Sequence, residues 1–402
     1  MSNNTYRLKK QVRQEIDLLH NEMIRIARSI YTKPEIGYQE FEASKTLSGF
    51  LESYGFEITR NIAGMETAFL AAYPKNSSEG PTIALLAEYD ALPGIGHGCG
   101  HNLIGTASAG AAVGLSRVFS DLKGKVIVVG CPAEEAGVNG AGGKIYLIEG
   151  GYFKKVDVAM IFHPSPRTTV GGETSALIGL EFKFNGKAAH AAGNPWDGVN
   201  ALDGVLQTFN AINAQRQHIR DNVRVHGIVT HGGDAPNIVP EYAAARFFIR
   251  SENGEYLKES VVKVENCAKG AALATGTELE IKRFNNFYDS MRSNSVLADV
   301  IESNLREVGL QVEGKKKGKG STDFGNVTQV VPACELAIRL GNGIIPHTRE
   351  FLEASNSEEG DEVICIAAKV LAMSTIDIIK DPDLLKRAKQ EFVKTSKIQE
   401  RG

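Results

Sequence analysis

Short apolar runs alternate with longer stretches of helical character over the first 165 residues of the chain. Four of these runs are bounded by polar or glycine-rich turns, as is typical of buried strands: 68–73, 83–87, 126–129 and 158–162. Between them, Leu103–Val118 and Ala141–Ile148 have the small-residue and apolar content of packed helices. Strands that alternate with helices predict an α/β domain, with helices on both faces of a mixed, mostly parallel sheet.

The pattern changes near Ser175. Residues 178–184 alternate between apolar and polar side chains, which predicts a strand that is buried on one face only. A helix is expected next, with its apolar positions running from Trp196 to Ile212. It is followed by strand-like runs at Val223–Val229, Tyr242–Arg250 and Glu278–Ile281. This order is typical of an α+β unit that collects its helices on one face of a sheet.

The chain then returns to the pattern of its first 165 residues, in which apolar strands alternate with helices. After about Met291 the pattern predicts a helix, a strand at Cys334–Leu340 and a long terminal helix from about Gly360. The simplest account is an insertion. We predict one domain made of residues 1–176 and 293–402, with a smaller α+β domain, 177–292, inserted into it.

Composition and charge exclude some classes of function. The 402 residues carry a formal net charge of −3, which argues against nucleic acid as a partner. The one basic cluster, residues 315–319, is interpreted as a solvated loop. No apolar stretch approaches the roughly 20 residues of a membrane span, and the polar N-terminus lacks a signal core. We therefore expect no membrane partner and no secretion.

The cysteines indicate a compartment. They are odd in number and widely spread along the chain: Cys99, Cys131, Cys267, Cys334 and Cys365. This favours free thiols over a disulfide framework, so we expect a reducing, cytoplasmic location.

Side chains that can bind metal follow the predicted strand at 83–87. Residues 87–93 end a predicted buried strand, and the glycine-rich loop after it carries Cys99 and His101. In open α/β sheets, ligand sites form beyond the carboxyl ends of strands. A thiolate and an imidazole two residues apart can bind one borderline-soft metal ion. The plainer interpretation is a glycine-rich turn with an inert cysteine and a surface histidine.

Three further strand-ends carry residues of the same kind. Glu134 and Glu135 follow the run at 126–129, His163 closes the next strand, and His347 follows the run at 334–340. Each alone is more often a solvated acid or a structural histidine. Four such elements at the ends of strands in one sheet favour a shared metal site.

The inserted domain contains three residues with side chains that could act in a site, although the sequence pattern alone does not identify them as functional. His190 and Asn237 fall in turns, and Arg250 closes a strand. A turn histidine, a turn asparagine and a surface arginine are the ordinary interpretations of these positions.

Taken together, the motifs resemble those of peptidase family M20, the aminoacylase and carboxypeptidase type of metallopeptidase. They are Asp-Ala-Leu-Pro (90–93), Gly-x-Gly-Cys-Gly-His (96–101), Pro-Ala-Glu-Glu (132–135), Gly-Lys-x-Ala-His-Ala (186–191) and Pro-His-Thr (346–348). The similarity runs from Pro34 to Phe351 and is to the amidohydrolase branch. It implies a metal-binding catalytic domain and an inserted lid that also forms a homodimer, or a higher oligomer.

The resemblance also implies roles for individual residues. Two divalent metal ions, zinc first and manganese, cobalt or nickel as alternatives, would be bound by Cys99, His101, Glu135, His163 and His347, with Cys99 bridging. Glu134 would be the general base. His190 and Asn237 would polarise the scissile carbonyl, and Arg250 would bind the substrate carboxylate. In dimers, the resemblance allows His190 or its neighbours to act either within their own chain or across the interface on the partner's site. Asp90 would orient a ligand rather than bind metal.

One departure indicates a subgroup. Most of the branch has Gly-His-Asp, whereas here Asn102 follows His101, and Thr322 replaces the glutamate of a Ser-Glu-Asp-Phe motif. These changes resemble the aminobenzoyl-glutamate hydrolase subunits and the β-alanyl or Xaa-basic dipeptidases. Because Asn102 lacks the negative charge of an aspartate, it is expected to alter metal affinity indirectly, through its effect on the metal ligands.

The predicted activity is hydrolysis of a small N-acyl or aminoacyl amino acid, or a dipeptide, with a free carboxylate. Metal ions would activate the attacking water and polarise the carbonyl, and Glu134 would take the proton of that water. Within this class an N-acyl amino acid deacylase and an aminobenzoyl-glutamate hydrolase stand beside a dipeptidase. A catalytically silent binding protein and a closed structural zinc site are the alternatives outside it.

Overall fold

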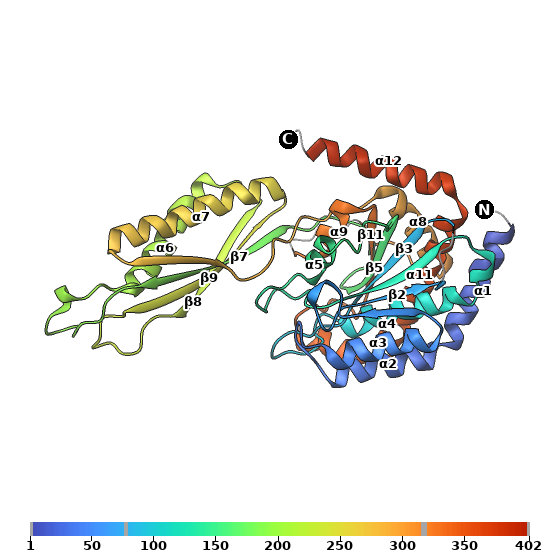
Figure 1. Ribbon diagram of the computed structural model, residues 1–402, viewed down its shortest axis with the longest axis horizontal. Helices are drawn as coiled ribbons and strands as arrows, with labels where there is room; N and C mark the ends of the chain where they lie inside the picture. The colour runs from blue at the N-terminus through green and yellow to red at the C-terminus, as the bar shows by residue number, and fades with distance from the viewer. Residues whose placement is uncertain (1–2, 76–78, 315–319, 400–402) are drawn as a thin grey trace. The chain divides into compact units, whose positions relative to one another are not determined.

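The chain divides into two compact units in the computed structural model, which describes residues 3–75, 79–314 and 320–399 (Figure 1). The first unit comprises residues 1–173, 291–318 and 323–402, and the second comprises 174–290 with the segment 319–322. The lysine-rich stretch predicted to be a solvated loop lies outside the described residues.

A mixed, mainly parallel sheet forms the centre of the first unit, as the pattern predicted. Its order is β1-β2-β4-β3-β5-β11-β6. The four strands β4, β3, β5 and β11 are contiguous and parallel, whereas β2, β1 and β6 join antiparallel at the edges. The strands span Glu57–Arg60 (β1), Phe69–Tyr73 (β2), Thr82–Glu88 (β3), Lys125–Cys131 (β4), Val158–Ser165 (β5), Thr169–Val170 (β6) and Ala333–Arg339 (β11).

The parallel arrangement decides where a site can form. The strands β3 and β4 are buried along almost their whole length, as their continuous apolar runs predict for strands covered on both faces. Because all four central strands run the same way, their carboxyl ends meet at one edge of the sheet. The loops after these strands therefore gather at that edge.

Helices cover both faces of this sheet. Figure 1 shows α2, α3 and α4 along one side and α5 and α9 on the other. The helix α4 is buried through Leu115 and contacts β3, β4 and β5, with α1, α2 and α11 against it. The helices span Asn3–Leu18 (α1), His20–Thr32 (α2), Phe41–Ser53 (α3), His101–Ser116 (α4), Gly143–Glu149 (α5), Ser295–Glu307 (α8), Phe324–Val330 (α9), Arg349–Ala354 (α10), Glu358–Lys380 (α11) and Pro382–Gln399 (α12).

Two long helical stretches of the first unit are each divided into two helices. The N-terminal helical pattern is divided at Leu19 into α1 and α2, although its apolar side chains remain buried. The terminal helix stops at Lys380 and a new one starts at Pro382. Proline has no backbone N–H and disfavours helical backbone in the residue before it, so Pro382 begins a helix instead of continuing one.

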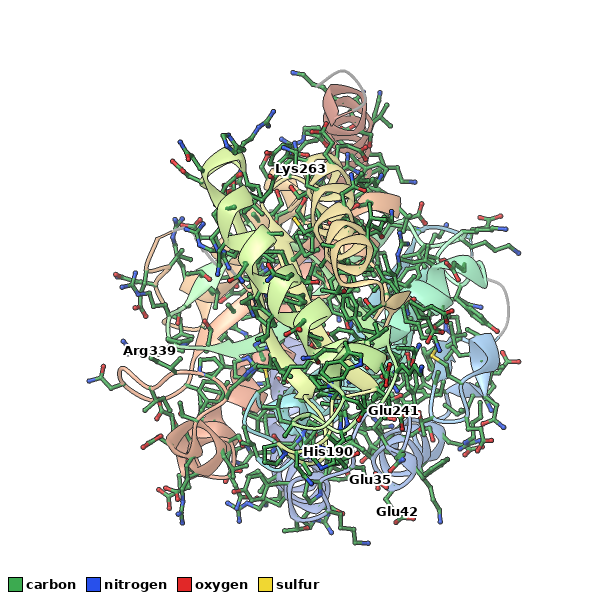
Figure 2. All side chains as sticks on the ribbon, turned by 90° about the vertical axis from the view of Figure 1, so that its left-hand side faces the viewer. Glu35, Glu42, His190, Glu241, Lys263 and Arg339 are labelled. Atoms are coloured by element: carbon green, nitrogen blue, oxygen red, sulfur yellow. The ribbon has the colours of Figure 1, made fainter. Side chains whose placement is uncertain are left out.

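The second unit is an antiparallel sheet with two long helices. Its order is β10-β7-β9-β8, and α6 and α7 pack side by side against it (Figures 1 and 2). The strands span Ala176–Asn185 (β7), Val223–His231 (β8), Tyr242–Ser251 (β9) and Glu278–Arg283 (β10), and the helices span Ala201–Gln215 (α6) and Gly254–Thr275 (α7).

The start of α6 was predicted too early. Trp196 lies in a short 3-10 turn with 78% of its surface exposed, and Val199 pairs its backbone with Lys187. The helix begins after Asn200, whose side chain accepts a hydrogen bond from the Leu202 backbone N–H. An asparagine cap satisfies a backbone donor of the first turn, which outweighs the apolar periodicity upstream.

Two general features concern the helices and the cysteines. None of the helices in the described part of the chain is long and apolar enough to cross a membrane. All five cysteines are free thiols, and four of them are buried.

Candidate metal centre

The residues expected to bind metal come from the carboxyl ends of the four central parallel strands and from the loops that follow them. The α4 N-terminus lies in the first of these loops. Gly100 precedes it with a φ of 74°, and a Cβ there would lie 2.6 Å from Pro164 Cγ, so only glycine fits between the two segments. The site residues are Asp90, Cys99 and His101 after β3, Glu134 and Glu135 after β4, His163 in β5 and His347 after β11.

His101 is held from behind by Asp90. Its Nδ1 lies 2.8 Å from Asp90 Oδ1, and both side chains are fully buried. The second oxygen of Asp90 accepts the Glu135 backbone N–H at 2.9 Å. Burial alone would lower the pKa of His101, but Asp90 and Cys99 outweigh it and raise that pKa well above its usual range. With Nδ1 facing Asp90, His101 presents Nε2 to the centre of the site.

Both adjacent glutamates reach His101 Nε2. One oxygen of Glu134 and one of Glu135 each lie 3.9 Å from it. Burial, together with the carboxylates of Glu88 and Glu135, raises the pKa of Glu134 well above its usual range. Burial also raises the pKa of Glu135 to about 7, against the opposing effect of His101. With raised pKa values, Glu134 and Glu135 tend to be protonated unless a cation binds to them in place of the protons.

Cys99 and His163 form the next pair. Cys99 Sγ lies 3.6 Å from His163 Nε2, and His163 Nδ1 lies 2.6 Å from the carbonyl oxygen of Pro164. A carbonyl can only accept, so Nδ1 carries the proton and Nε2 keeps its lone pair toward Cys99. Burial, reinforced by the Glu135 carboxylate, raises the pKa of the Cys99 thiol.

His347 approaches from the loop after β11. Its Nε2 lies 3.7 Å from Glu135 Oε1, and its side chain is 53% exposed. The residue has a φ of 70°, which L side chains rarely adopt, and its backbone N–H donates to Gly98 O at 2.8 Å. Such strain persists where the surrounding structure imposes it, and it is frequent at functional sites.

The donors form groups in which every ligand atom lies within 4.8 Å of the others. Cys99, His101 and His163 form one group, and Cys99, Glu135 and His347 form a second. The two share the Cys99 sulfur. A third contains His101, Glu134 and Glu135.

A cation fits this arrangement. His101 Nε2 and Glu135 Oε1 are buried and have no hydrogen-bond partner within the described ranges. Buried polar atoms are almost always paired, so two such atoms 3.9 Å apart indicate a site that suits a cation. Thiolate, imidazole and carboxylate are the ligands of zinc-type sites, and each must lose its proton to bind. Because the pKa values of Cys99, His101 and Glu135 are raised, these side chains hold protons that a metal ion would displace on binding.

The Glu134–Glu135 turn is fixed by a residue that sequence reasoning missed. Glu40 Oε1 accepts the Ala133 backbone N–H at 2.8 Å, and its other oxygen accepts the Thr67 hydroxyl at 2.9 Å. Ala133 has a φ of 53°, so the chain turns sharply just before Glu134. Nothing near Glu40 in the sequence signals this role, because the contact spans 93 residues.

A second missed feature is a buried lysine beside the carboxylates. Lys144 Nζ lies 2.6 Å from Glu88 Oε1 and also pairs with Asp323 Oδ1, while its backbone N–H donates to Asp323 Oδ2 at 3.0 Å. All three side chains are at most 1% exposed. Glu88 and Asp90 are two residues apart at a strand end, so alternation along the strand could have indicated that both face one side.

Asn102 lies in the first turn of α4 and is buried. Its Nδ2 donates to the carbonyl oxygens of Ser355 at 3.0 Å and Ala27 at 3.4 Å. These bonds connect the start of α4 to α2 and to the end of α10. The predicted effect of Asn102 on metal affinity would therefore act through the position of α4.

The second unit brings two of its three expected site residues together. His190 and Ile238 form an antiparallel bridge, and the Ala191 N–H donates to the Asn237 carbonyl oxygen at 3.0 Å. His190 is exposed (Figure 2), and its Nδ1 accepts the backbone N–H groups of Gly193 at 3.0 Å and Ala192 at 3.2 Å. Its proton is therefore on Nε2, which is free to donate.

Arg250 lies near the end of β9, whereas Asn237 precedes the start of that strand. Arg250 follows Tyr242 by eight residues of β9, about 26 Å of extended chain. Arg250 Nη1 donates to Ser321 Oγ at 2.9 Å, within the motif Gly320–Phe324. The second unit of one chain thus separates Arg250 from the His190 and Asn237 pair.

The comparison with protein families decides the classification. Residues 84–370, which include every strand-end of the centre, match the model of peptidase family M20/M25/M40. The chain belongs to this family. It is a metal-dependent hydrolase, and the resemblance in its motifs is confirmed.

Curated members of the family M20/M25/M40 match almost the whole chain. A Xaa-Arg dipeptidase from Mus musculus is 36% identical over 96% of this chain and 92% of its own length. One of the subunits of p-aminobenzoyl-glutamate hydrolase from Escherichia coli is 29% identical over 91% of each. These are the types of family member to which the Asn102 motif pointed.

Solved structures of this family share the fold. A dinuclear metal-binding peptidase of family M20 from Bacillus subtilis aligns with a TM-score of 0.67 at 21% identity, over 90% of this chain and 99% of its own. An aminobenzoyl-glutamate utilization protein from Klebsiella pneumoniae aligns with a TM-score of 0.71 at 18% identity, over 91% and 98%. Both support the mixed, mainly parallel sheet flanked by helices, with a separate second sheet.

Proposed function

We propose that this chain is a two-metal dipeptidase that hydrolyses the amide bond of a small dipeptide with a free carboxylate. The observation that carries the proposal is the pair of donor groups that share Cys99, with the buried carboxylate of Glu134 beside them. In this arrangement Cys99, His101 and His163 would hold one ion, and Cys99, Glu135 and His347 would hold the other. Zinc suits these donors best, with manganese, cobalt and nickel as alternatives.

The chain's own groups carry out the proton transfers. Ions at this site would supply Lewis-acid polarisation of the carbonyl and a more acidic water. Glu134 accepts a proton from the attacking water as the new C–O bond forms. It then delivers that proton to the amine nitrogen as the C–N bond breaks, and the second proton of the water stays on the new carboxyl group. Asp90 orients His101 throughout.

Groups of the second unit complete the site. His190, with its proton on Nε2, and Asn237 donate to the carbonyl oxygen as negative charge develops there. Arg250 binds the substrate carboxylate through its guanidinium. Because β9 separates Arg250 from His190, we propose that His190 and Asn237 act on the catalytic centre of another copy of the chain.

The proposed homodimer forms through the edge of the second sheet. Among the residues that the structure describes, the strand β8 has a neighbour on one side only, and it exposes Ile228 and Val229, which are 66% and 44% accessible. A long apolar edge strand is a template for pairing with another copy, which gives a homodimer or a higher oligomer. Light scattering should report a dimer for the wild type and a monomer for Ile228→Lys. Wild-type protein that is monomeric would contradict this assembly.

The proposed substrate is a dipeptide with a C-terminal basic residue. Support comes from two relatives of 36% and 35% identity, both Xaa-Arg dipeptidases. An aminobenzoyl-glutamate substrate and an N-acyl amino acid are the alternatives within the class, because members with such names are less similar, at 29% and 24%. The five free thiols support the cytoplasm as the location.

The test compares wild type with Glu134→Gln. Metal-loaded protein is incubated separately with a Xaa-Arg dipeptide, aminobenzoyl-glutamate and an N-acetyl amino acid, and released amino acid is measured by chromatography. Wild type should hydrolyse the dipeptide fastest. Glu134→Gln should lose at least about a hundredfold in rate while it keeps its metal. Glu335→Gln, which alters a buried glutamate of β11, is the matched control and should behave as wild type.

Three outcomes would contradict the proposal. Normal turnover by Glu134→Gln would remove that residue as the base. Wild-type protein that binds two ions and the dipeptide but releases no amino acid would favour a catalytically silent binding protein. One tightly bound ion per chain without hydrolysis would favour a structural zinc site.

A further inference from the structure

Three buried atoms face one another at the centre and have no hydrogen-bond partner within the described part of the chain. They are His101 Nε2, Glu135 Oε1 and Glu88 Oε2. Glu88 Oε2 lies 3.7 Å from His101 Nε2, closer than the 3.9 Å of Glu135 Oε1. Two donors of one ion, each about 2.0 to 2.2 Å from it, can be no more than about 4.4 Å apart. Glu88 therefore satisfies the same geometric condition as Glu135.

The other oxygen of Glu88 is already occupied. Glu88 Oε1 pairs with Lys144 Nζ at 2.6 Å, and Lys144 is held in turn by Asp323 through its side chain and its backbone N–H. Lys144 and Asp323 are fully buried. The lysine can therefore not move away from the carboxylate, and Glu88 can present only Oε2 to His101.

An ion pair alone does not explain this orientation. A carboxylate that served only to neutralise Lys144 would gain nothing from placing its second oxygen, without a partner, in a buried site lined by Glu134 and Glu135. Burying an anionic oxygen that has no hydrogen-bond partner costs free energy; the His101 ring at 3.7 Å offsets that cost only when it is protonated, whereas an ion in the site would recover it. Glu88, Glu134 and Asp323 lie within 4.8 Å of one another through one ligand atom each.

We propose that Glu88 is a further metal ligand, binding through Oε2 the ion that His101 binds, and that Lys144 and Asp323 position it. The inference rests on the proposed two-metal function. It adds a protein donor to that site and explains why a lysine is buried beside carboxylates. Lys144 and Asp323 are positioning residues, since neither is inferred to touch the ion.

The experiment measures metal binding and coordination, independent of turnover. Metal-free wild type, Glu88→Gln and Glu88→Asp are titrated with Co²⁺ alone, and visible absorption reports both affinity and coordination number. Glu88→Asp keeps the charge near Lys144 but withdraws the oxygen from His101. Glu335→Gln is again the matched control for loss of a buried glutamate in the same sheet.

Both Glu88 variants should lose at least about tenfold in affinity for one Co²⁺ and show a changed visible spectrum at saturation. Wild-type affinity in Glu88→Asp would mean that only the charge matters and would overturn ligation. Weaker binding with an unchanged spectrum would also overturn it, because the coordination sphere would be intact. Failure of wild type to bind Co²⁺ would instead overturn the proposed function. Circular dichroism shows whether each variant is folded, and Glu88→Asp provides the test if Glu88→Gln is not.

Discussion

Asp90 and His101 form a fully buried pair, with 2.8 Å between Asp90 Oδ1 and His101 Nδ1. The same carboxylate receives the Glu135 N–H on its other oxygen at 2.9 Å. One aspartate therefore fixes a side chain on α4 and a backbone segment after β4. It does so from the side of the histidine that faces away from the proposed metal centre, which sets the ring orientation and keeps Nε2 available.

Replacing Asp90 with asparagine should weaken metal binding. Asparagine has one acceptor oxygen, so its NH₂ group must face either the His101 Nδ1–H or the Glu135 N–H, and two donors then oppose each other. We expect the affinity for Zn²⁺ to fall by about tenfold to a hundredfold, measured by competition with a chelator.

The control for this substitution is Asp157→Asn. Asp157 also connects two parallel strands, since its Oδ2 accepts the Thr82 N–H at 2.8 Å, but it does so at the amino end of β5, opposite the metal centre. Its affinity for Zn²⁺ should match wild type. Equal losses in both variants would mean that the sheet, and not the orientation of His101, determines binding.

Much of the fold could be predicted because each signal was local. The central strands are short apolar runs, and strands that alternate with helices predict a parallel sheet, so the edge where Cys99, Glu135 and His347 gather could be inferred. The alternating pattern of β7 likewise indicated a half-exposed sheet in the second unit. Family motifs then attached roles to these positions, which remain proposals.

The features that could not be predicted from the sequence depend on contacts between residues that are distant along the chain. A lysine in a short helix is usually solvated, and the burial of Lys144 is explained by its pairing with Glu88 and with Asp323, which is 179 residues away. The turn at Ala133 depends in the same way on Glu40. Arg250 and His190 are separated by the length of β9, because His190 pairs with Ile238 before that strand begins. A single sequence does not reveal such pairing.

Glu40 should make stability depend on pH. Burial, with the nearby Asp90 carboxylate, raises the pKa of Glu40 from 4.5 to about 7. The folded state thus binds this proton more tightly than the unfolded state does. The stabilisation is fully present below about pH 4.5 and is lost as pH rises through about 7. The change corresponds to about 3 kcal/mol.

Glu40→Gln isolates this contribution. Urea denaturation of wild type and variant at pH 5 and pH 8 gives the difference in free energy of unfolding at each pH. That difference should shift in favour of the wild type at pH 5, by up to about 3 kcal/mol. A difference that is the same at both pH values would show that Glu40 titrates normally.

Two helical glycines should respond oppositely to alanine. In α3, a Cβ at Gly49 would meet nothing within 4 Å, so Gly49→Ala should stabilise the protein by about 0.5 to 1 kcal/mol through lower backbone entropy in the unfolded chain. In α4, a Cβ at Gly110 would lie 2.1 Å from Met23 Sδ, which is buried in α2. That overlap should cost about 1 to 3 kcal/mol before the same entropic gain is counted.

This pair tests why α4 is so rich in small residues. The helix is buried through Leu115 and carries His101 in its first turn, so close packing against α2 also holds a proposed metal ligand. Thermal denaturation should therefore give a higher midpoint for Gly49→Ala and a lower one for Gly110→Ala than for wild type. If both rise, Met23 has moved aside and helix propensity decides the outcome. In that case the small residues of α4 would not be required by its packing against α2.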